Sequence, residues 1–111
     1  MIQKGRYGMQ TIIIRLFPEK LENADLDLRY YIPERIEEIT DGVVQDNGYD
    51  YLEENALALW MQTENAASAY PAIVKLFREE TFMGNDLSLS AELYISEKDT
   101  DELENCRLVY P

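Results

Sequence analysis

The chain is predicted to fold as an α+β protein of the ferredoxin-like kind, a two-layer sandwich in which two helices cover one face of a mainly antiparallel sheet. Short segments rich in β-branched or alternating apolar residues and two longer segments with helical apolar spacing lead to this prediction. Their order along the chain is strand, helix, strand, strand, helix, strand. With 111 residues, 46% of them hydrophobic, the chain is long enough to bury one core. Residues 1–8 contain two glycines and precede a second methionine, so we expect a flexible tail followed by a single domain over residues 9–111.

Two strands are predicted in the first third of the chain. Residues 11–17 are rich in isoleucine, and Ile12 and Ile14 share one face of the extended backbone. The proline at position 18 ends this strand. Residues 25–32 alternate charged and apolar side chains with a period of two, so we expect a short additional strand at the edge of the sheet.

Two helices follow from apolar spacing and capping residues. The first is predicted to begin at Pro33, which suits the first helical position because its missing N–H has no intrahelical partner there. It ends either at Gly42, the preferred end, or at Gly48. The second covers residues 66–80, with Asn65 as its cap. The apolar residues that recur at helical spacing along the first helix are Ile32, Ile36, Ile39 and Val43.

Three more strands complete the core of the sheet and a fourth segment extends it. Residues 43–51 favour a strand interrupted by a bulge or turn at Asn47–Gly48. Residues 56–63 are apolar on both faces, which is typical of an interior strand. Residues 87–96 alternate cleanly, and residues 106–110 form a terminal strand at the edge.

Two helices cannot cover both faces of such a sheet. We therefore expect the second face to be open to solvent or to a partner. The residues placed on this open face are Ile13, Arg15, Phe17, Ala58, Trp60, Ser88, Ser90, Glu92 and Tyr94.

The charge of the chain excludes several functions. There are 22 Asp and Glu residues against 10 Lys and Arg, a net charge of −12 with a pI of about 4.2. A protein that binds nucleic acid or anionic lipid needs a basic surface, so we expect neither direct nucleic-acid binding nor membrane binding. The sequence has neither an apolar run long enough to span a membrane nor a signal peptide, which predicts a cytoplasmic protein.

The residues used most often in catalysis and metal binding are scarce. Histidine is absent, and Cys106 is the one cysteine, so no Ser-His or Cys-His pair and no thiolate zinc cluster can form. The acidic run at residues 99–104 departs from a calcium loop because Leu103 stands at a ligand position and no glycine follows. We therefore expect no enzymatic activity, no cofactor and no metal site.

Tyrosines beside carboxylates are the most informative feature. Tyr30–Tyr31 and residues 49–51 place rigid amphipathic rings next to acidic groups, a combination typical of protein interfaces. The other interpretation is that the tyrosines and Trp60 fill the core. The residues predicted to bind a partner are Glu37, Glu38, Asp41, Tyr49, Asp50, Tyr51, Glu53, Glu54 and Trp60.

With its size, charge and α+β order, and with the stretches 39–51 and 82–88, the chain resembles the small acidic bacterial immunity proteins of contact-dependent inhibition and related polymorphic toxin systems. The resemblance implies a tight, stoichiometric complex with a basic toxin domain, for example a nuclease, and no catalysis. It assigns no role to individual residues.

Two other classes of function fit the same sequence. In one, the sheets of two copies enclose a pocket, making a dimeric ferredoxin-like module that binds a small ligand or catalyses a reaction, with Trp60 in the apolar part of the open face. In the other, carboxylates copy phosphate positions and the protein inhibits a DNA-binding enzyme as a DNA mimic.

Overall fold

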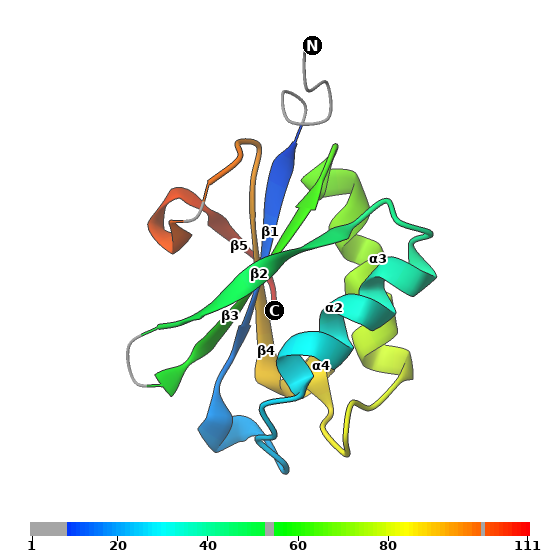
Figure 1. Cartoon of the computed structure of the whole chain (residues 1–111), viewed down its shortest axis with the longest axis vertical. Helices are drawn as coiled ribbons and strands as arrows, with labels where there is room; N and C mark the ends of the chain where they lie inside the picture. Colours follow the sequence, from blue (N-terminus) through cyan, green and yellow to red (C-terminus); the bar gives the residue numbers. More distant parts are fainter. Residues whose placement is uncertain (1–8, 53–54, 101) are drawn as a thin grey trace.

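The computed structural model describes residues 9–52, 55–100 and 102–111. It is an α+β structure in which all strands of the sheet pair antiparallel, in the order β2-β3-β1-β4-β5 (Figure 1). The tail predicted at residues 1–8 lies outside the described residues. The elements are β1 (Gln10–Leu16), η1 (Pro18–Lys20), α2 (Leu28–Ile39), β2 (Gln45–Tyr51), β3 (Leu57–Thr63), α3 (Ala66–Glu79), α4 (Leu87–Ser90), β4 (Ala91–Ser96), η3 (Leu103–Asn105) and β5 (Arg107–Tyr110).

The central strands β1 and β3 carry apolar side chains on both faces. Ile12 and Ile14 of β1 and Leu59 of β3 are fully buried on the face against which α2 and α3 pack (Figure 1). The predicted strands at residues 11–17 and 56–63 are therefore confirmed, and β3 lies inside the sheet between β1 and β2. The terminal strand is also confirmed, as β5 at the edge next to β4.

Helix α3 confirms the second predicted helix. The side chain of Asn65 accepts a hydrogen bond from the backbone N–H of Ser68 at 3.1 Å and so caps its first turn. Ile73 and Phe77, four positions apart, lie on the side of the helix that is buried against the sheet.

Helix α2 corrects two predictions. Residues 25–32 do not form a strand, and the helix begins at Leu28 rather than at Pro33. Leu28, Ile32 and Ile36 are four residues apart and all buried, so one stripe of the helix covers the sheet. The alternation at residues 25–32 led to the wrong prediction of a strand, because Leu28 and Ile32 fit both a period of two and the helical period. The free energy gained by burying the apolar stripe of the helix favours the helix over the strand.

The end of α2 agrees with the preferred prediction. The helix ends at Ile39, and the chain then turns through Gly42, whose φ of 80° belongs to the left-handed region. The N–H of Gly42 donates to the carbonyl oxygen of Glu37 at 2.9 Å, which satisfies one of the last carbonyls of the helix. The chain is thereby free to enter β2.

Strand β2 is interrupted where predicted. Its pairing with β3 shifts register between Asp46 and Tyr49, and Gly48 has a φ of 102°. A glycine adopts this conformation without a side-chain clash, so the bulge at Asn47–Gly48 is confirmed.

The predicted strand at residues 87–96 is correct only from Ala91 onward. Residues Leu87–Ser90 form a helical turn, α4, because the side chain of Asp86 accepts from the backbone N–H of Ser88 at 3.0 Å. The expected positions of Ser88 and Ser90 on the open face are therefore wrong, and Ser90 is buried.

The second face of the sheet is covered in part by the chain itself. Ile13, Ala58 and Trp60 form a small buried cluster, against which Leu103 and Cys106 pack. These two residues belong to the connection between β4 and β5, which lies on the side of the sheet opposite to α2 and α3 (Figure 1). The expectation of a wholly open face is corrected accordingly.

Candidate partner-binding surface

Three tyrosines from two separate segments meet where α2 lies beside β2. The ring centroids of Tyr30 and Tyr49 are 6.4 Å apart, and those of Tyr49 and Tyr51 are 6.1 Å apart. Both pairs meet edge to face, at 85° and 89°. We call Tyr30, Tyr49 and Tyr51 the tyrosine row. Their exposed fractions are 53%, 43% and 53%, so the row forms surface rather than core.

The register of β2 separates the predicted Tyr49–Asp50–Tyr51 stretch. Tyr49 and Tyr51 lie opposite Leu59 and Leu57, which face the helices. Asp50 lies opposite Ala58, which faces the other side of the sheet. The carboxylate therefore flanks the strand on the side away from the tyrosine row.

Arg29 completes the row and was not predicted from the sequence. Its guanidinium carbon lies 4.3 Å from the centroid of Tyr30 and 5.2 Å from that of Tyr49. One guanidinium nitrogen donates to the carbonyl oxygen of Leu26 at 2.8 Å. The pKa of Arg29 is raised above its ordinary value, chiefly by the side chain of Tyr30. The one available signal was its position before two tyrosines.

Carboxylates occupy the exposed edge of β2. Glu37 of α2 accepts from the backbone N–H of Asp46 at 2.9 Å, and this bond ties the helix to the strand. Asp46 accepts from the N–H of Gly48 at 3.0 Å, and Asp50 from the N–H of Tyr51 at 2.8 Å. Three amides of an edge strand are thus bonded to the chain's own carboxylates and are withheld from strand addition by another molecule.

Glu38 serves a different contact. It pairs with Arg35 at 2.8 Å, and Arg35 also makes two hydrogen bonds to Glu80, at 2.6 and 3.0 Å. These bonds raise the pKa of Arg35 and lower that of Glu80. Since Glu80 caps the end of α3, Arg35 connects the two helices, and the charge of Glu38 is compensated locally.

The remaining predicted residues are placed apart from the tyrosine row or outside the described part of the chain. Asp41 is exposed just beyond α2, with a φ of 52°. Trp60 is only 9% exposed, which agrees with the interpretation that it fills a core and leaves no free ring to anchor a partner. Glu53 and Glu54 lie outside the described residues.

The burial of Trp60 also bears on the dimeric module considered above, because the apolar patch that it required lies under Leu103 and Cys106. Polar side chains lie beside this cluster. The hydroxyl of Tyr94 donates to Glu92 at 2.7 Å, and Arg15 lies 3.8 Å from the same carboxylate. Burial raises the pKa of Tyr94, so its hydroxyl stays protonated at neutral pH.

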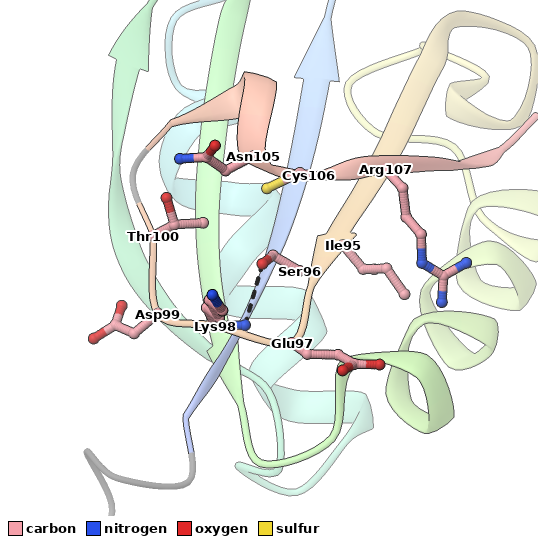
Figure 2. A pocket seen from close by; sticks show the side chains of 9 residues that line it. All are labelled: Ile95, Ser96, Glu97, Lys98, Asp99, Thr100, Asn105, Cys106 and Arg107. Atoms are coloured by element: carbon pink, nitrogen blue, oxygen red, sulfur yellow. Dashed lines mark hydrogen bonds between the residues drawn. The ribbon is translucent and has the colours of Figure 1, made fainter.

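A polar hollow of about 680 Å³ lies beside the connection between β4 and β5. Figure 2 shows side chains that reach it from the end of β4, from the following loop and from the start of β5. The thiol of Cys106 lies here, and burial raises its pKa, so the reactive thiolate is disfavoured. Lys98 and Arg107 contribute positive charge and Glu97 and Asp99 negative charge, which leaves no single preferred ligand.

Comparisons with known protein families, with curated proteins and with solved structures gave no significant match. Among the residues that the structure describes, no three His, Cys, Asp or Glu side chains are grouped so that they could hold a metal ion. No helix in the described part of the chain has the length and apolar character needed to cross a membrane.

Proposed function

We propose that this chain is a non-catalytic protein-binding inhibitor that neutralises a basic partner through the acidic surface of α2 and β2. One observation carries the proposal: tyrosines and carboxylates from two distant segments meet on one exposed surface. Residues 27–51 contain seven Asp and Glu against two Arg, and both arginines are engaged within the chain. The surface therefore offers rigid rings and unneutralised carboxylates, which suits a cationic partner.

The net charge adds a kinetic argument. A domain with a charge of −12 is steered towards a basic cleft, at about 10⁸–10⁹ M⁻¹s⁻¹ at low salt against about 10⁵–10⁶ M⁻¹s⁻¹ without steering. An inhibitor that must reach its target before the target acts benefits from this rate. The same feature is expected of an immunity protein that neutralises a basic toxin domain.

We infer further that the scaffold is a ferredoxin-like sandwich with an added edge strand. The strand–helix–strand–strand–helix–strand order of β1, α2, β2, β3, α3 and β4 supports this inference. So do the antiparallel pairing of these four strands and the packing of both helices on one face. In this interpretation β5 is the addition, and α2 with β2 forms the outer border that meets the partner.

Co-expression with a candidate toxin tests the function. The candidate is a larger protein encoded by a neighbouring gene with a variable, basic C-terminal domain. We expect the chain to rescue cells from this protein. The variant Asp46→Lys/Asp50→Lys should lose rescue and slow association at least about tenfold.

The matched control is Glu64→Lys/Glu79→Lys, which changes the net charge equally at exposed positions away from the tyrosine row. We expect this control to keep its rescue. An equal loss of rescue in both variants would mean that binding depends on the net charge alone and that the α2–β2 surface is not the interface. Absence of rescue by the wild-type chain, with both proteins soluble, would reject the pairing.

A further inference from the structure

In the tyrosine row, the guanidinium of Arg29 lies over two of the three rings, and the ring of Tyr51 has no such contact. Arg29 stacks over Tyr30 and Tyr49. Tyr51 continues the row, is 53% exposed, and has no cation over its ring among the described residues. We propose that the exposed ring of Tyr51 receives an arginine side chain of the partner, with Asp50 adding negative charge from the other face of the same edge strand. The proposal rests on the function proposed above and names the chemistry by which the surface recognises its partner.

Arg29 is the evidence that the row accepts this group. A guanidinium is planar and weakly hydrated, so it stacks on a tyrosine ring at less cost than the compact, strongly hydrated ammonium of lysine. The distances of 4.3 and 5.2 Å to two ring centroids lie within the range of a cation–π contact. Tyr51 presents the same ring type one step further along the row, at the exposed edge of the sheet.

Asp50 supplies the complementary charge. One of its oxygens accepts from the backbone N–H of Tyr51 at 2.8 Å, which fixes the carboxylate at the strand edge, on the face away from the ring. No ion pair engages Asp50 among the residues that the structure describes. A carboxylate oriented in this way offers its remaining acceptor sites to the N–H groups of an arginine.

The hydrogen bonds already made at the β2 edge indicate that the partner binds through its side chains and not through its backbone. The amides of Asp46, Gly48 and Tyr51 are already bonded to carboxylates, and the bulge at Gly48 breaks the register. Addition of a partner strand would have to displace these bonds. An arginine that projects from a loop or a helix requires no such change.

Two peptides of equal charge test the proposal. One contains four Gly-Ser-Arg repeats and the other four Gly-Ser-Lys repeats, and binding to the full chain is followed by NMR at low salt. We expect the arginine peptide to bind about two to five times more tightly, the range of an exposed cation–π contact, with the largest shifts at Tyr51. Tyr51→Phe should keep this preference, Tyr51→Ala should abolish it, and Asp50→Asn should weaken both peptides.

The outcomes separate this proposal from the function on which it rests. Equal binding of both peptides by the wild-type chain would overturn the arginine preference and leave acidic docking in place. A preference that survives Tyr51→Ala would overturn the assignment to Tyr51. If neither peptide binds the arginine site is rejected, whereas rescue by co-expression still decides the inhibitor function separately. Tyr70→Ala on α3 is the matched control, and it should leave the preference unchanged.

Discussion

The two edges of the sheet are built differently. The β2 edge is a seven-residue strand with every residue exposed, and it carries Asp46 and Asp50 on the same strand as Tyr49 and Tyr51. The β5 edge has four residues, and residues 105–111 contain one arginine and no acid. Beside it, Lys75, Arg78 and Glu79 of α3 line a hollow with Tyr110.

The acids are therefore placed differently at the two edges: Asp46 and Asp50 lie on β2 itself, whereas near β5 Glu97 and Asp99 lie in the connection that precedes it. A basic partner that docks on a strand edge would meet carboxylates on β2 and Arg107 on β5. The carboxylates of the proposed docking surface also bond to the amides of β2, so one set of residues protects the edge and carries the proposed attraction of a basic partner. A short strand such as β5 needs less protection, because it exposes fewer amides.

The largest effect on the free energy of unfolding is expected where α2, which lies beside β2, packs on the core. Ile32 of α2 is fully buried against the sheet, so Ile32→Ala should lower the free energy of unfolding by about 2–5 kcal/mol. Leu108 on β5 is 48% exposed, so Leu108→Ala should change it by only about 0.5 kcal/mol. Urea unfolding of both variants measures the difference. Equal losses would contradict the burial of the helical stripe of α2.

The bulge of β2 gives an intermediate effect. Gly48→Ala places a side chain at a φ of 102° with open space around it, so the cost is backbone strain alone, about 1–3 kcal/mol. The neighbouring Asn47→Ala should change the free energy of unfolding by about 0.5 kcal/mol or less. Thermal and urea unfolding of the pair test this expectation. A Gly48→Ala variant as stable as Asn47→Ala would show that the edge runs without the bulge.

The smallest effect concerns the contact between the helices and depends on pH. Arg35 lowers the pKa of Glu80, so this carboxylate stabilises the fold above its ordinary pKa, near 4.5, and the contribution is lost as the pH falls through the lowered value. Glu80→Gln should therefore be less stable than the wild type at about pH 6, and the gap should narrow by about pH 3. Glu79→Gln, at the neighbouring exposed position, is the matched control. A difference in stability between Glu80→Gln and the wild type that does not change with pH would show that the ion pair with Arg35 does not stabilise the fold.

Much of the fold could be predicted because local patterns determine it. The short apolar runs of β1 and β3, the cap at Asn65 and the bulge at Gly48 each depend on a few neighbouring residues. The start of α2 could not be predicted in this way. Leu28 and Ile32 satisfy both a period of two and a helical period, and the burial of Ile36 in line with them selects the helix.

The candidate surface was predicted in its composition and only partly in its arrangement. Tyr49, Asp50 and Tyr51 were chosen for the right chemistry, but the register of β2 sends Asp50 to one face and the tyrosines to the other. Trp60 was considered both as a core residue and as a partner contact, and it lies in a core beneath Leu103. Arg29 was missed, since its role depends on a ring that is twenty residues away in the sequence.

The amino-acid sequence by itself determined the α+β class, most strand and helix positions, the acidity and the lack of histidine, because these follow from residue types and their short-range spacing. Only the tertiary structure decided which tyrosines share a surface, which acids protect the edge of β2 and what covers Trp60. Those outcomes depend on which distant segments pack together, and packing is governed by the burial of whole faces rather than by any one segment.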